Sequence, residues 1–90
     1  MLIKYFADIR KLTGVEQQPW TKAEPTLRSL LKDLAVQHGP AFEERMFKGD
    51  RISSTVIIMV NGRNIEHLSG LETPLAPDDV VVIFPMVAGG

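Results

Sequence analysis

The strongest hydrophobic pattern in the chain is a helical stripe between positions 26 and 38. Thr26 is a good N-cap residue, and Gly39 followed by Pro40 supplies an end to the helix. Ser29 stands where a capping box usually has glutamate, so we expect only half of that motif. Spacings of three and four place one set of apolar side chains on a single helical face: Leu27, Leu30, Leu31, Leu34 and Ala35. The pattern predicts an amphipathic helix over 26–38.

Short runs of apolar and β-branched residues predict strands on both sides of this helix. Pro19 restricts the second run to a short strand or to the edge of a sheet. Asn61-Gly62 is a strong turn pair, so the runs on either side of it are predicted to form a hairpin. The run before that turn is continuously apolar and is predicted to be a buried strand. The expected strands are 2–7, 15–21, 56–60, 63–66 and 80–84.

The remaining segments are predicted to be connections or short helices. Residues 8–14 break the strand pattern and end on glycine, which suits a turn or a short helical loop. Residues 41–47 favour a short second helix, whereas 48–54 are polar and are expected to form a loop. Residues 67–79 contain one glycine and two prolines and predict an irregular connection.

The order of these elements predicts the fold class. Strands from both ends of the chain bracket one amphipathic helix, which indicates an α+β domain with a mixed sheet and that helix across one face. This arrangement is the β-grasp, or ubiquitin-like, fold. Ninety residues provide one hydrophobic core, so we expect a single domain over 1–90 with a flexible C-terminal tail over 85–90.

A single main helix covers only one face of such a sheet. Strand alternation places Ile3, Tyr5, Val81 and Ile83 under the helix, so their neighbours lie on the other face: Leu2, Phe6, Val80, Val82 and Phe84. An exposed apolar surface of this kind marks a site for a protein partner. The alternative is that the loop over 69–77 and the short helix cover part of it. We favour the partner interpretation.

Composition narrows the function classes. The chain is 44% hydrophobic and 23% charged with a net charge of −1, which fits a folded domain and argues against a nucleic-acid binder. It has no cysteine, which excludes disulfides and thiolate metal sites. No secretion signal or apolar run of membrane-spanning length is evident. We therefore expect a cytoplasmic protein that binds neither nucleic acid nor membrane.

The titratable residues do not form a recognisable active site. His38 falls at the predicted helix end, where it would interact with the last carbonyls, and His67 lies in a loop. Neither has metal-ligand spacing to another residue. The acidic pairs Glu43-Glu44 and Asp78-Asp79 are adjacent in sequence, which suits surface and turn positions. We expect no complete active site and no bound cofactor or metal.

The C-terminal stretch FPMVAGG is the most unusual segment. Pro85 is expected to end the sheet pairing, and the chain then finishes on Gly89 and Gly90. A backbone without side chains can enter a channel too narrow for other residues. The reactive group that such an end would deliver is the α-carboxylate of Gly90.

This ending resembles the FPPVAGG and FPPVTGG endings of the small subunit of molybdopterin synthase, a MoaD-like member of the MoaD/ThiS sulfur-carrier superfamily. The resemblance extends over nearly the whole chain. It includes the segments KYFADIRKLTG, PTLRSLLKDL, VNGRNI and PLAPDDVVVIFP.

The resemblance implies a carrier that is not an enzyme by itself. An E1-like adenylating enzyme would use ATP to activate the Gly90 carboxylate, and a sulfurtransferase donor would convert it to a thiocarboxylate. That end would then enter the large subunit of molybdopterin synthase, where sulfur passes to a pterin precursor of the molybdenum or tungsten cofactor. Gly89 would provide clearance. The partner-binding residues implied are Phe6, Arg10, Phe84, Pro85 and Val87.

Two departures from the family's sequence pattern leave open which molecule receives the sulfur. Met86 replaces the family's second proline, and residues 66–71 look like an insertion near the partner face. A carrier of sulfur for thiamine or for another metabolite would keep the same tail chemistry. So would a ubiquitin-like modifier that joins Gly90 to lysines of other proteins.

Overall fold

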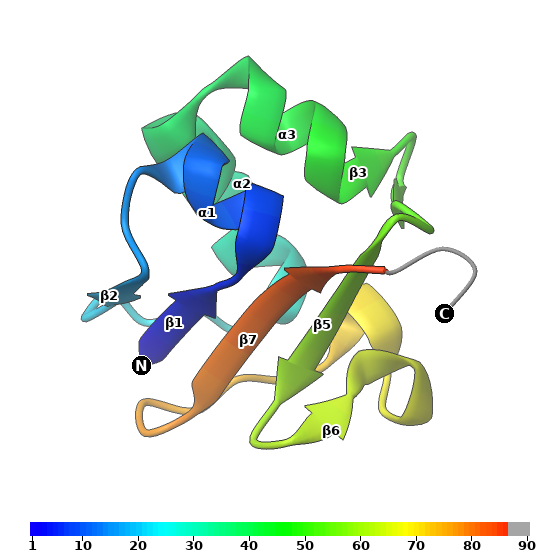
Figure 1. The fold of residues 1–90 in the computed structure, drawn as a ribbon. Coiled ribbons are helices and arrows are strands. Elements are labelled where there is room, and N and C mark those ends of the chain that lie inside the picture. The colour runs from blue at the N-terminus through cyan, green and yellow to red at the C-terminus, as the bar shows by residue number, and fades with distance from the viewer. Residues whose placement is uncertain (87–90) are drawn as a thin grey trace.

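The computed structural model describes residues 1–86, in which a five-stranded sheet carries its helices on one side (Figure 1). The strand order is β2-β1-β7-β5-β6. β1 and β7 run parallel, and the other pairs are antiparallel. The strands are β1 (Leu2–Tyr5), β2 (Gln17–Pro19), β5 (Val56–Val60), β6 (Arg63–Asn64) and β7 (Val80–Pro85). The expected mixed sheet of the β-grasp fold is confirmed.

Helix α2 (Leu27–His38) crosses behind the sheet in Figure 1, as the apolar stripe predicts. Each of the five stripe residues is buried. The expectation of half a capping box is wrong. Thr26 Oγ1 accepts from the Ser29 amide at 3.3 Å, and the Thr26 amide donates to Ser29 Oγ at 3.4 Å. The serine hydroxyl accepts the bond that a glutamate carboxylate usually takes.

Two shorter helices lie at one end of the sheet. β1 ends at Tyr5, two residues before the end of the expected first strand, because the chain turns at Ala7, whose φ is +53°. α1 (Ala7–Thr13) begins at that turn. It ends at Gly14, whose φ of +75° is a left-handed cap. α3 (Pro40–Met46) confirms the expected second helix and buries Phe42 and Met46, which lie four residues apart.

The connections contain more regular structure than the sequence pattern predicts. The polar segment 48–54 is not a simple loop, because β3 (Phe47–Lys48) and β4 (Arg51–Ile52) pair as a small hairpin. The expected strand 63–66 stops at Asn64 and continues as the 3-10 helix η1 (Ile65–His67). A second 3-10 helix, η2 (Gly70–Glu72), lies within the expected irregular connection.

The last strand includes Pro85, one residue more than the expected strand 80–84. Pro85 lies opposite Val56 and is the last paired residue of the β5–β7 register, so sheet pairing ends at Pro85 as expected. One further backbone bond follows the strand, because the Met86 amide donates to the Thr55 carbonyl oxygen at 2.9 Å.

The core lies between the sheet and α2. It contains the inward-facing residues of the three central strands together with side chains from every α-helix. Its fully buried members include Ile3, Tyr5, Ile9, Leu30, Leu31, Leu34, Phe42, Met46, Val81 and Ile83.

Candidate functional site

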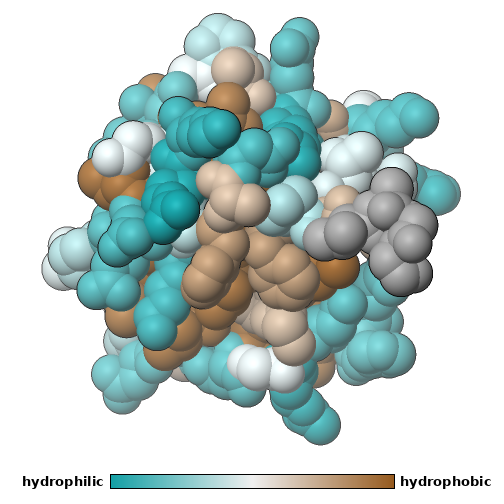
Figure 2. All heavy atoms as spheres, in the orientation of Figure 1, coloured by the Kyte–Doolittle hydropathy of each residue, from teal (hydrophilic) through white to brown (hydrophobic). Residues whose placement is uncertain are grey.

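The face of the sheet opposite α2 is a continuous apolar surface, which we call the open face. The strand pairings place its residues in three rows, because residues paired across strands share a face. Leu2 is beside Val80; Lys4, Val82 and Met59 form the next row; and Phe84 is beside Ile57. Figure 2, in the orientation of Figure 1, shows brown and tan atoms gathered over these central strands.

Ile57 and Met59 are members of the open face that sequence reasoning missed. The run 56–60 was expected to be buried throughout, but its exposure alternates, with only Val56, Ile58 and Val60 buried. The missing information was that β5 is covered on one side only. A continuous apolar run does not distinguish a strand buried on both faces from one whose second face is apolar and exposed.

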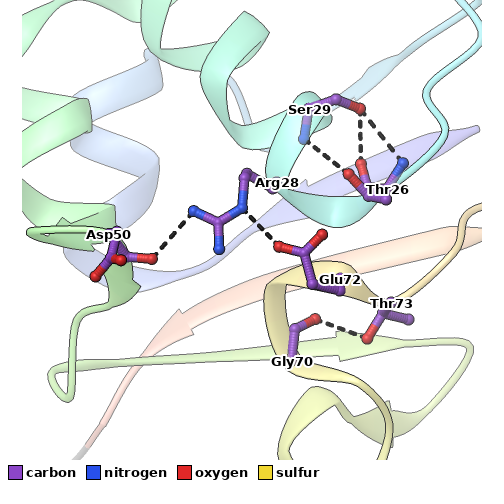
Figure 3. A network of polar contacts seen from close by, with 7 residues as sticks. All are labelled: Thr26, Arg28, Ser29, Asp50, Gly70, Glu72 and Thr73. Carbon is purple, nitrogen blue, oxygen red and sulfur yellow. Dashed lines mark hydrogen bonds and ion pairs between the residues drawn. The ribbon is translucent and has the colours of Figure 1, made fainter.

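The loop over 69–77 does not cover the open face, so that part of the alternative interpretation is wrong. The loop runs beside the segment that leads into α2: the Leu27 amide donates to the Thr73 carbonyl oxygen at 2.9 Å, and the Leu75 amide to the Pro25 carbonyl oxygen at 3.3 Å. Arg28 Nε also lies 2.7 Å from Glu72 Oε1 (Figure 3). The loop therefore packs on the helix side of the molecule.

Most of the expected insertion over 66–71 lies away from the open face. Leu71 is buried in the core, and η2 packs against α2. Glu66, at the start of the segment, lines a pocket with Ile57 and Met86. The expected location near the partner face is therefore wrong for η2 but not for Glu66. The physical reason is that Leu68 and Leu71 supply apolar surface that helps to cover the core.

Three of the expected partner-binding residues gather at one end of the open face. Phe6 is 49% exposed, and its amide donates to the Ile83 carbonyl oxygen at 3.1 Å, which places Phe6 next to Phe84 in the parallel register. Arg10, from α1, has Nη1 at 2.6 Å from Glu16 Oε1. Phe6 and Arg10 line the same shallow pocket of about 230 Å³, together with Lys4 and Glu16.

The remaining expected site residues lie at or beyond the end of β7. Pro85 is half-buried at the end of that strand. Val87, Gly89 and Gly90 lie outside the described residues. The strand that carries Phe84 on the open face thus leads, through Pro85 and Met86, directly into the segment with the expected chemistry.

His38 was expected to interact with the last carbonyl groups of its helix, but its side chain contacts Gln18 instead. Its Nε2 lies 2.8 Å from Gln18 Oε1, which also accepts from the Tyr5 hydroxyl at 2.6 Å. The ring packs against Tyr5 and Phe42. Burial lowers the pKa of His38 and raises the pKa of Tyr5. We interpret this cluster as a structural contact between β1, β2 and the end of α2.

Two further properties concern the described part of the chain only. In residues 1–86, no group of three or more His, Asp or Glu side chains is placed to hold a metal ion. No helix among those residues is both long enough and apolar enough to cross a membrane.

Comparisons with known proteins agree with this arrangement. A family model described as the ThiS family matches residues 3–90. A candidate sulfur carrier protein from Archaeoglobus fulgidus is 37% identical over 65 residues, covering 72% of this chain and 74% of that protein.

Two solved structures are similar over almost the full length. The small archaeal modifier protein 1 from Methanosarcina acetivorans is 33% identical with a TM-score of 0.85, and the match covers 99% of this chain and 94% of that one. A candidate molybdopterin converting factor subunit 1 from Pyrococcus furiosus is 32% identical with a TM-score of 0.76, covering 96% and 95%.

Proposed function

Because the chain belongs to the ThiS family, within the superfamily of sulfur carriers and ubiquitin-like modifiers, we propose that it carries sulfur on Gly90 for molybdopterin synthesis. The observation that carries the proposal is the family match, which runs to the terminal Gly-Gly. The likeness to a molybdopterin converting factor subunit supports the choice of pathway.

The chemistry begins with a carboxylate, which is a poor electrophile. A partner enzyme joins the Gly90 carboxylate to the AMP portion of ATP and releases pyrophosphate, so that the carbonyl carbon acquires a good leaving group. The outer sulfur of a sulfurtransferase persulfide then displaces AMP, and a second thiol cleaves the resulting S–S bond, which leaves a disulfide on the donor side and a thiocarboxylate on Gly90. Gly89 allows the end to enter a narrow active site. The chain binds no cofactor itself, and the reaction takes place in the cytoplasm.

The open face supplies the docking surface for these partners. Phe84 and Phe6 offer aromatic surface at the end nearest the tail, and Arg10 lies beside Phe6 in the shallow pocket. Aromatic and arginine side chains are the residues that most often dominate binding at protein interfaces. The same surface serves both the activating enzyme and the large subunit of molybdopterin synthase, which bind in turn.

The proposal is tested by the intact mass of the protein after incubation with the activating enzyme of the same organism, ATP and a sulfur donor. Exchange of one oxygen for sulfur adds about 16 Da at the terminus. Removal of Gly90, or addition of one residue after it, is expected to abolish this gain because reacting groups tolerate displacements of only about an ångström.

Thermal unfolding provides the control for that experiment. Glycine has no side chain to pack, so both tail variants are expected to unfold within about 0.5 kcal/mol of the unchanged protein. A chain ending at Gly89 that gains sulfur as fast as the full chain would contradict the proposal.

A second candidate function is a ubiquitin-like modifier, favoured by the likeness to a small archaeal modifier protein. In that case Gly90 forms an isopeptide bond with lysines of other proteins, and proteolytic digests of the cell contain branched peptides bearing its C-terminal residues. A third candidate is a sulfur carrier for thiamine or another metabolite. Transfer of labelled sulfur to a pterin precursor by the isolated large subunit separates that candidate from the first.

A further inference from the structure

The end of β7 is held by contacts that do not belong to the sheet alone. The Met86 amide donates to the Thr55 carbonyl oxygen at 2.9 Å. Thr55 is itself fixed through its side chain, because Oγ1 lies 2.8 Å from Ser53 Oγ and accepts from Arg45 Nε at 3.3 Å. The Thr55 amide also donates to Ser53 Oγ at 3.2 Å. The last described residue therefore depends on a short, locally ordered segment over 53–55.

Arg45 links this segment to the helix that follows β1. Its Nη1 lies 2.7 Å from Asp8 Oδ2, and its side chain is only 25% exposed. The hydrogen bond from Arg45 is the main reason that the pKa of Asp8 lies below its usual value. One side chain of α3 thus contacts α1 and the 53–55 segment simultaneously.

These contacts matter because of where the chain leads. Gly90 is four residues beyond Met86, a reach of at most about 14 Å for extended backbone. Met86 is the point from which the terminal segment starts, and reaction rates are sensitive to displacements of about an ångström. The Asp8 side chain is 53% exposed, and an ion pair open to solvent on one side contributes little to stability, so this pair has no large role in folding.

On the basis of the proposed function, we propose that Arg45 is a positioning residue that holds Met86, the residue from which the terminal segment starts, in place beside the sheet. It acts through Thr55 and does not touch the reacting carboxylate. Its guanidinium suits this role because two of its nitrogens bond to two different elements, which the single ammonium of lysine does less well.

The chain contains a matched control for Arg45 in Arg28. Arg28 also joins separate elements: Nε lies 2.7 Å from Glu72 Oε1, and Nη1 donates to the Asp50 carbonyl oxygen at 3.0 Å (Figure 3). Its side chain is 32% exposed, close to the value for Arg45. Arg28 lies on α2, behind the sheet, and has no contact with the end of β7.

The experiment compares Arg45→Met, Arg45→Lys and Arg28→Met in the full chain. The first measurement is hydrogen exchange at the Met86 amide, with the Val82 amide in the centre of the sheet as the reference for global unfolding. We expect exchange at Met86 to be about tenfold faster in Arg45→Met, with Val82 unchanged, because the 53–55 segment loses its fixed partner. Arg28→Met is expected to leave the Met86 amide as protected as in the unchanged protein.

The second measurement is sulfur acceptance with the activating enzyme, ATP and a sulfur donor. Arg45→Met is expected to lower kcat by about tenfold or more, with KM within about twofold, because docking is retained while the terminus is misplaced. Arg45→Lys keeps the charge opposite Asp8, so its kcat is expected to lie between those of Arg45→Met and the unchanged protein. Arg28→Met is expected to change neither constant.

Different results of the two measurements contradict the positioning role of Arg45 and the proposed function. Equal Met86 exchange in Arg45→Met and the unchanged protein overturns the proposal, whatever the terminal chemistry is. Faster exchange with an unchanged kcat also overturns it, because the contact would then order the strand end without positioning Gly90. If the unchanged protein gains no sulfur, the proposed function fails and the positioning role fails with it.

Discussion

At the scale of single residues, Gln18 holds together three elements that the sequence pattern does not connect. Its Oε1 accepts from the Tyr5 hydroxyl and contacts His38 Nε2, and its Nε2 donates to Gln37 Oε1 at 3.2 Å. His38 must carry a proton on Nε2 to bond to that oxygen. The helix-end position of His38 was predictable from sequence, but its partner was not, because Gln18 lies 20 residues away.

This contact predicts how stability depends on pH. Burial lowers the pKa of His38 in the folded protein below the value of about 6.5 in the unfolded chain, so protonation favours unfolding. The contribution of His38 is therefore fully present above pH ~6.5 and decreases as the pH falls through the folded pKa. Urea midpoints measured between pH 7.5 and 5 are expected to decline, and less steeply in His38→Gln.

The exposed His67 supplies the comparison for this measurement. His67→Gln should retain the decline seen in the unchanged protein. If His38→Gln and the unchanged protein lose stability in parallel over that pH interval, burial of His38 is not the cause.

At the scale of elements, α2, which supplies five buried residues to the core, is fixed at its start by two hydroxyl groups. The Thr26 and Ser29 side chains each accept a bond from the other residue's amide, and Ser29 Oγ also donates to the Thr26 carbonyl oxygen at 2.9 Å (Figure 3). These bonds satisfy amides that have no partner within the helix. The same turn is held from outside by the bond between the Leu27 amide and Thr73.

Loss of this cap has a predictable cost. Thr26→Ala is expected to lower the free energy of unfolding by about 1 kcal/mol, within the range measured for N-cap threonines. Chemical denaturation measures the change in the free energy of unfolding. Thr21→Ala is the control, because Thr21 is an exposed threonine outside α2. Thr21→Ala should remain within about 0.5 kcal/mol. Equal effects of the two substitutions would show that the cap contributes nothing.

Elements with strong local signals could be predicted, and those that depend on distant contacts could not. The stripe in α2 and the Asn61-Gly62 turn are local; both turn residues have positive φ, as that turn requires. The β3–β4 hairpin has only two residues in each strand, too few for alternation to show. The sequence predicts only a turn or a short helical loop over 8–14, because the seven residues of α1 bury only Ile9 fully and show no apolar stripe.

At the scale of the whole molecule, the sheet separates the core from the open face, so similar residues on its two sides have different roles. Phe42 is fully buried among core side chains, whereas Phe84 is only half-buried on the open face. The alternation along β1 and β7 predicts this division into a core face and an open face from the sequence alone. The predicted set of open-face residues lacks the two from β5, because hydrophobicity does not alternate along that strand. The sequence of a strand also does not show which elements cover its two faces.

The division predicts opposite outcomes for two substitutions. Phe42→Ala should destabilise the fold by about 3–5 kcal/mol, because it leaves a cavity in the core. Phe84→Glu should stay folded but bind the activating enzyme about 30-fold more weakly, as expected for an aromatic residue that dominates an interface. Thermal unfolding and titration with the enzyme measure the two effects.

Val36→Glu is the matched control for Phe84→Glu. Val36 is 86% exposed on α2, on the opposite side of the sheet, so adding a charge there should leave binding unchanged. An unfolded Phe84→Glu, or equal weakening by both substitutions, would refute the assignment of the open face.

The parallel pairing of β1 with β7 has a consequence for synthesis of the protein. The ribosome makes β1 first, yet the central position of the sheet stays empty until β7 has been translated. Until then β1 has only β2 as a neighbour, and an isolated two-stranded hairpin is marginally stable in water. Chains that terminate early therefore keep the leucine stripe exposed to proteases and chaperones. A molecule that has folded is one whose translation has passed Pro85, so folding itself selects chains that extend almost to Gly90.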